Sequence, residues 1–183
     1  MRNLVSAIYM TSKDVQTIPR AHPHIRAGDW LSPLVCRLLQ RVDYVDGDKT
    51  LSFSVRSASQ IKTENSYSFN WQGMKNDVDQ IRRTYQEPVI TEFATLALAC
   101  ASVELFAKME VTEVLRRGQR ADYWLGDREL LLEASGQQDG NLDKLHEEKA
   151  KQLKENPFGK DGYVCVANYG KALAQFWYHD YEA

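Results

Sequence analysis

The chain has 183 residues, of which 43% are hydrophobic and 26% are charged, and its formal net charge at pH 7 is -2. This length is sufficient to bury a core, and the composition is typical of one globular domain with an elaboration rather than of a disordered chain. A charge so close to neutral excludes a uniformly basic nucleic-acid-binding domain. The longest apolar run, near residues 93–103, contains Thr and Ser and cannot cross a bilayer, so we expect no membrane partner. The three cysteines lie within apolar runs, which favours buried free thiols in a reducing cytoplasm.

The first 33 residues predict one strand followed by a loop. Residues 3–10 are typical of a strand, whereas residues 11–33 contain three prolines and a glycine. This loop includes His22-Pro23-His24, in which two histidines offer ligands to a metal. The sequence supplies no third ligand at a helical or hairpin spacing, so a plain surface loop is the preferred interpretation of this tripeptide.

An Asp-Gly turn at residues 46–48 predicts a hairpin between residues 34–46 and residues 49–57. Apolar and polar side chains alternate over residues 51–55 and again over residues 66–71, which predicts a small antiparallel sheet with one buried face. The apolar residues at positions 74, 78, 81 and 85 have helical spacing and predict an amphipathic helix. Residues 1–88 are therefore interpreted as an N-terminal β-rich elaboration with one helix.

Residues 89–183 predict a core of helices and strands. The expected elements are, in order, a helix over 92–106, strands over 109–115, 121–125 and 129–134, a charged helix over 142–153, and strands over 163–168 and 173–181. The first helix is apolar on nearly all sides, which indicates that it is buried, and Glu92 is expected in its first turn. A carboxylate there either interacts with the helix dipole or belongs to a site.

The hairpin formed by residues 121–125 and 129–134 carries one carboxylate on each strand. Asp122 on the first strand and Glu133 on the second are placed to share one end of a sheet. Two converging carboxylates repel each other unless a proton or a cation lies between them. A hard divalent ion such as Mg²⁺ is the usual occupant of an all-oxygen site.

Asp122, the following turn and Glu133-Ala134-Ser135 resemble the core of the PD-(D/E)XK nuclease superfamily, which has the restriction-endonuclease-like fold. The order of expected elements from about residue 91 to residue 181 is similar to that family's order of helix, three antiparallel strands, helix and strand. The resemblance implies an α/β restriction-endonuclease-like core over residues 89–183. It also implies a metal site at Glu92, Asp122 and Glu133 for Mg²⁺ or Mn²⁺.

The resemblance departs from the family pattern at one position. The family has a lysine two residues after the glutamate, where this chain has Ser135. Members of the family are known to relocate this lysine to the following helix, so Lys144, or Lys151 on the same helix face, is a candidate to replace it. The implied catalytic residues are then Asp122, Glu133 and Lys144.

Two functions follow from this resemblance. The first is a Mg²⁺-dependent nuclease acting on DNA or RNA within a bacterial multi-protein assembly, such as a defence or DNA-processing system. The second is a catalytically inactive protein of the same fold that serves as a structural or protein-interaction subunit, which the near-neutral charge and Ser135 favour. Nucleic acid is the expected ligand in the first case, and protein partners or further copies of the chain are expected in both.

Overall fold

The structure is a computed structural model that describes residues 11–39 and 47–181. The predicted strand over residues 3–10 lies outside these described residues. The elements are β1 (Thr11–Asp14), η1 (Val15–Thr17), α1 (Ile18–Ala21), η2 (Ala27–Trp30), α2 (Leu31–Leu38), β2 (Gly47–Arg56), β3 (Lys62–Trp71), α3 (Lys75–Thr84), α4 (Glu87–Ser102), the π-helical turn η3 (Val103–Ala107), β4 (Val111–Val114), β5 (Tyr123–Leu125), β6 (Leu130–Gln137), α5 (Leu142–Lys154), β7 (Gly162–Asn168) and β8 (Leu173–His179).

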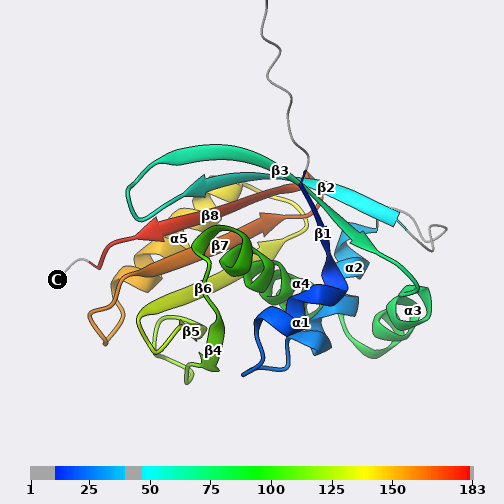
Figure 1. The fold of residues 1–183 in the computed structure, drawn as a ribbon, viewed down its shortest axis with the longest axis horizontal. Coiled ribbons are helices and arrows are strands. Elements are labelled where there is room, and N and C mark those ends of the chain that lie inside the picture. The colour runs from blue at the N-terminus through cyan, green and yellow to red at the C-terminus, as the bar shows by residue number, and fades with distance from the viewer. Residues whose placement is uncertain (1–10, 40–46, 182–183) are drawn as a thin grey trace, which may run out of the picture.

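The strands of the described residues form one mixed sheet in the order β1-β3-β2-β8-β7-β6-β5-β4 (Figure 1). Strands β4, β5 and β6 are successive antiparallel neighbours, β7 is parallel to β6 because α5 connects them, and β8 is antiparallel to β7. Strand β2 pairs with β8 in parallel, so the N-terminal strands extend the same sheet. The prediction of a mixed α/β fold is confirmed.

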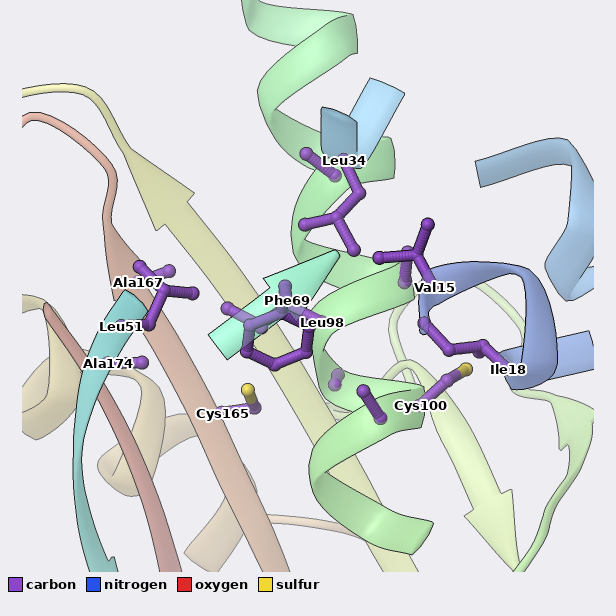
Figure 2. Close-up of a cluster of buried hydrophobic side chains, with 14 of the residues drawn as sticks. Val15, Ile18, Leu34, Leu51, Phe69, Leu98, Cys100, Cys165, Ala167 and Ala174 are labelled. Atoms are coloured by element: carbon purple, nitrogen blue, oxygen red, sulfur yellow. The ribbon is translucent and has the colours of Figure 1, made fainter. Parts of the chain in front are cut away.

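The two faces of the sheet have separate apolar cores. Helix α4 lies on one face. The apolar core on this face also includes residues of η1, α1, α2 and the strands on both sides of β8. Figure 2 shows Leu34, Phe69, Leu98, Cys165 and Ala174 of this core. Helix α5 lies on the other face, where Leu131 and Val164 pack with its apolar residues. Each fully buried leucine or phenylalanine in these cores stabilises the fold by about 1.5–3 kcal/mol.

Helix α4 and η3 together form an apolar helical segment, Glu87–Ala107, which is the one segment of the described residues long and apolar enough to cross a membrane. Most of this segment is buried inside the protein. Burial of this kind is expected of a helix that forms the core of a globular domain, and α4 packs here against α2, β6 and β7. The three cysteines of the chain, Cys36, Cys100 and Cys165, are buried free thiols.

The N-terminal part differs from the prediction in two places. Residues 34–39 do not form a strand: Leu31–Leu38 is the helix α2, because its short apolar run packs one face against α4. The rest of the predicted strand, residues 40–46, lies outside the described residues. The expected loop over residues 11–33 contains β1 and short helical turns. The hairpin is instead formed by β2 and β3, and Gly47 begins β2 rather than lying in a turn.

Helix α4 begins earlier than predicted. Its first residue is Glu87, and Pro88 lies in the first turn, where a proline is tolerated because the missing N–H has no helical acceptor. Glu92 is therefore in the second turn. Gly136 on β6 allows α4 to approach the sheet closely, since a Cβ built at this position would lie only 2.0 Å from the Thr95 Oγ1.

Candidate functional site

Strands β5 and β6 place Asp122 directly opposite Glu133. The antiparallel register pairs Tyr123 with Leu132, so the residue before β5 faces the residue after Leu132. Backbone hydrogen bonding continues through this position, because the amide of Asp122 donates to the carbonyl oxygen of Leu132 at 2.9 Å. The structure therefore brings the two predicted carboxylates together on adjacent strands.

Both carboxylates lie on the face of the sheet that α5 covers. Side chains alternate between the faces of a strand, and Trp124 and Leu131 belong to the apolar core beneath α5. Asp122 is two residues from Trp124, and Glu133 is two residues from Leu131, so each shares that face. Two like charges placed opposite each other on neighbouring strands destabilise the sheet unless other groups compensate them.

Asp122 is compensated by a backbone group. Its Oδ2 accepts a hydrogen bond from the amide of Ala134 at 2.8 Å, at the position just before β5 begins. Burial raises the pKa of the Asp122 carboxyl above its ordinary value, and the Glu92 charge adds to this rise. The Ala134 amide and the Lys149 charge oppose the rise.

Glu133 is compensated by a lysine. Its side chain is only 1% exposed, and its Oε1 accepts a hydrogen bond from the Nζ of Lys149 at 2.6 Å. Within the described residues, the other oxygen, Oε2, is buried without a hydrogen-bond partner. Burial and the neighbouring Asp122 charge together raise the pKa of Glu133 to about 7, although Lys149 lowers it. A buried carboxylate oxygen without a partner is costly and calls for a ligand or a proton.

The lysine beside the acidic pair is Lys149, which was not among the lysines predicted for this site. Lys149 also donates a hydrogen bond to the Oε1 of Gln152 at 3.3 Å, one turn further along the same side of α5. Lys144 lies on the solvent side of α5, where its side chain is 75% exposed and its Nζ is 4.0 Å from Glu148. Lys151 is exposed as well. The structure therefore brings Lys149, rather than Lys144 or Lys151, to Glu133.

A signal for Lys149 is present in the sequence. The buried residues Leu142, His146 and Leu153 of α5 have spacings of four and seven, and Lys149 completes the pattern as 142, 146, 149 and 153. These positions form one stripe of a helix. A lysine within the apolar stripe indicates a buried anion nearby, whereas the spacing of Lys144 and Lys151 places both of them on the opposite side.

A cavity of about 640 Å³ opens beside the acidic pair. Glu92 from α4 and Asp122 line it, together with Gln152 from α5 and three arginines of the loop between β4 and β5. Glu92 is exposed to solvent, and its charge reaches Asp122 through this cavity. The cavity thus joins elements on both sides of the sheet at the place where β5 begins.

The acidic residues around the cavity offer oxygen ligands to a divalent ion. The donor set of Asp122, Glu133 and Glu92 consists entirely of carboxylate oxygens, which suits Mg²⁺ or Mn²⁺, and the buried Oε2 of Glu133 lacks a partner. As the described side chains stand, no three histidine, cysteine, aspartate or glutamate residues are gathered closely enough to hold a metal. The carboxylate oxygens of Asp122 and Glu133 suit such an ion, and Glu92 lies further from them, in the cavity wall.

The tripeptide His22-Pro23-His24 does not form a metal site. His22 is fully buried, its Nε2 lies 2.9 Å from the carbonyl oxygen of Cys100, and its Nδ1 accepts from the amide of Val111 at 2.9 Å. These contacts require a neutral ring with the proton on Nε2. Burial lowers the pKa of His22, which is consistent with this tautomer. His24 is exposed and lies 3.7 Å from Glu110.

Comparison of the chain with models of protein families, with curated proteins and with solved structures gave no match.

Proposed function

We propose that this chain is a metal-dependent nuclease with a restriction-endonuclease-like core, acting on DNA or RNA within a bacterial multi-protein assembly. The order α4, β4-β5-β6, α5 and β7 is the order of helix, three antiparallel strands, helix and strand that such a core has. The observation that carries the proposal is the ion pair of Lys149 with Glu133 opposite Asp122. It supplies, from α5, the positive charge that Ser135 lacks.

The residues have separate roles in this proposal. Asp122 and Glu133 would hold the metal, and Glu92 in the cavity wall would contribute a further carboxylate. A bound Mg²⁺ or Mn²⁺ supplies Lewis-acid stabilisation of the phosphate and lowers the pKa of a water molecule. Lys149 holds a positive charge beside Glu133, and its hydrogen bond to Gln152 limits the positions that its ammonium group can adopt.

A second candidate function is a catalytically inactive subunit that retains the fold. One observation favours it: each carboxylate already has an internal partner, since the Ala134 amide binds Asp122 and Lys149 binds Glu133. In this case the four groups form a structural network without a metal. The protein would then act through its surface, as a partner of other chains.

Cleavage assays distinguish the two functions. The chain is incubated with plasmid DNA, linear duplex, single-stranded DNA and RNA in the presence of Mg²⁺ or Mn²⁺. We expect cleavage that Asp122→Asn, Glu133→Gln and Lys149→Met each reduce by about 100-fold or more, the size of effect seen when one preorganised electrostatic group is removed. Lys144→Met is the matched control, because this lysine is on the same helix but faces solvent.

Calorimetric titration with Mn²⁺ provides a second readout. Under the nuclease proposal, the wild-type chain binds Mn²⁺, and Asp122→Asn and Glu133→Gln weaken this binding. If the wild-type chain, alone and with its natural partners, binds no Mn²⁺ and cleaves no nucleic acid, the inactive subunit is the correct function.

A further inference from the structure

The loop between β4 and β5 carries three arginines in five residues, at the mouth of the cavity that contains Asp122. Arg116, Arg117 and Arg120 all line this cavity. The chain as a whole has a net charge of -2, so this concentration of positive charge is local. It faces Glu92 and Asp122, the two carboxylates of the cavity lining.

The loop is held in a defined conformation. The amide of Leu115 donates to the carbonyl oxygen of Asp122 at 2.8 Å, which closes the loop at its base. Within it, Gln119 accepts a hydrogen bond from the amide of Arg116 at 2.7 Å through its side chain. Arg120 adopts a left-handed backbone conformation with φ of 66°, and its guanidinium lies 3.4 Å from Glu155 at the end of α5. An ion pair therefore links the loop to the end of α5.

Two of the three arginines have unused hydrogen-bonding groups. Among the described residues, the guanidinium groups of Arg116 and Arg117 form no hydrogen bond or ion pair. In the described part of the chain, Asp122 forms no ion pair with these arginines, although they line the same cavity. The exposed guanidinium groups of Arg116 and Arg117 and the half-buried Asp122 thus line one cavity without pairing with each other.

We propose that Arg116 and Arg117 bind the phosphate backbone of a nucleic acid that crosses the mouth of this cavity. A guanidinium group matches a phosphate with two parallel hydrogen bonds, and arginine remains charged at all physiological pH values. The unpaired guanidinium groups at this cavity suit a ligand that carries anionic oxygens. Because the contacts go to phosphate, binding is independent of base sequence. This inference rests on the proposed function, since it identifies the ligand of the same site.

The test is a binding measurement that requires no cleavage. Fluorescence anisotropy of short fluorescein-labelled duplex and single-stranded DNA and RNA is recorded in EDTA, over a series of salt concentrations. For Arg116→Ala/Arg117→Ala we expect binding about tenfold weaker or more, and a plot of log affinity against log salt that is less steep by about 2. Arg116→Lys/Arg117→Lys retains the charges and should restore most of the salt dependence.

The matched control is the other tandem arginine pair, Arg82 and Arg83, on α3. Figure 1 shows α3 at one end of the molecule, away from β4 and β5. Arg82→Ala/Arg83→Ala removes the same total charge and should leave both affinity and salt slope unchanged. Circular dichroism establishes that each variant is folded.

The outcomes separate this inference from the proposed function. If the Arg116/Arg117 variant loses affinity and slope while no cleavage is found, the binding site stands and the nuclease function fails. If the chain cleaves nucleic acid while the variant binds as tightly as the wild type, the function stands and the arginine site is wrong. Absence of binding to any of the nucleic acids, or an equal loss in the Arg82/Arg83 control, also overturns the inference.

Discussion

Lys149 and Glu133 form an ion pair of 2.6 Å between α5 and β6, with the glutamate side chain 1% and the lysine side chain 26% exposed. The pair connects the helix to the centre of the sheet at the point where Asp122 faces Glu133 across the strands. Removing one partner of a buried pair leaves the other without compensation, which is usually more destabilising than replacing both.

Lys149→Met is therefore expected to lower the free energy of unfolding by about 1–3 kcal/mol at neutral pH. The cost is limited because Glu133, once left alone, takes up a proton instead of remaining ionised in the core. Urea denaturation measures this loss, and Lys144→Met should stay within about 0.5 kcal/mol of the wild type. Adding Glu133→Gln to Lys149→Met should recover part of the loss. A Lys149→Met variant as stable as the wild type would show that the pair is not maintained in solution.

The pH dependence of stability should reveal the raised pKa of Glu133. Because the folded chain holds this proton more tightly than the unfolded chain, whose glutamate titrates near 4.5, the stability contributed by Glu133 is fully present below pH 4.5. This contribution is lost as the pH rises toward about 7, where Glu133 titrates in the folded chain. The loss is on the order of 3 kcal/mol.

The measurement compares the wild type with Glu133→Gln at a series of pH values. We expect the wild type to lose stability relative to the variant between pH 4.5 and about 7. His146, whose pKa burial lowers to about 3, is common to both chains, so its opposite effect cancels in the difference. A difference that does not change with pH would mean that Glu133 is ionised as easily in the folded state as in the unfolded state.

Gly136→Ala should destabilise the packing of α4 on β6. The added Cβ would lie 2.0 Å from the Oγ1 and 3.3 Å from the Cβ of Thr95, so one of the two elements has to move. Overpacking of this kind costs about 1–3 kcal/mol. Thr95→Ala removes the nearer atom, so the double variant should be more stable than the sum of the two single effects predicts. Simple additivity in a double-mutant cycle would place the strain elsewhere.

His22→Phe should destabilise the fold although it preserves an aromatic ring. The change removes the partner of the Val111 amide and a partner of the Cys100 carbonyl oxygen in the core. Each buried backbone group left without a hydrogen bond costs about 1–3 kcal/mol. Thermal denaturation should show a clear decrease for this variant and none for His24→Phe, because His24 is exposed. Equal behaviour of the two variants would contradict the structural role of His22.

The strands of the second half were predictable because their signals are local. Residues 121–134 contain a hairpin turn between two apolar stretches, and the structure has β5 and β6 there. The apolar run at residues 34–38 was ambiguous, since a short run of this kind is compatible with a strand or a helix, and packing against α4 decides for the helix. The turn predicted at Asp46-Gly47 also put the hairpin too early in the chain, because the hairpin is formed by β2 and β3.

The candidate site was predictable only in part, for a different reason. The positions of Asp122 and Glu133 follow from one hairpin, so sequence spacing alone places them together. The position of Lys149 depends on how α5 packs on β6, which is a tertiary relationship. The arginines of the β4–β5 loop are similar, because their relation to Asp122 depends on the conformation of the loop around Arg120.

The parallel pairing of β2 with β8 has a consequence for how the chain can be divided. Strand β8 is the last described strand, yet residues 52–56 of β2 cover its free edge. Residues 11–71 and 89–181 share a backbone ladder and a core, so we expect these segments, produced as two separate polypeptides, to reassociate on mixing and elute together. The second segment alone would expose the edge of β8, and an uncovered strand edge pairs with other chains. Size-exclusion chromatography should therefore show this segment as aggregates.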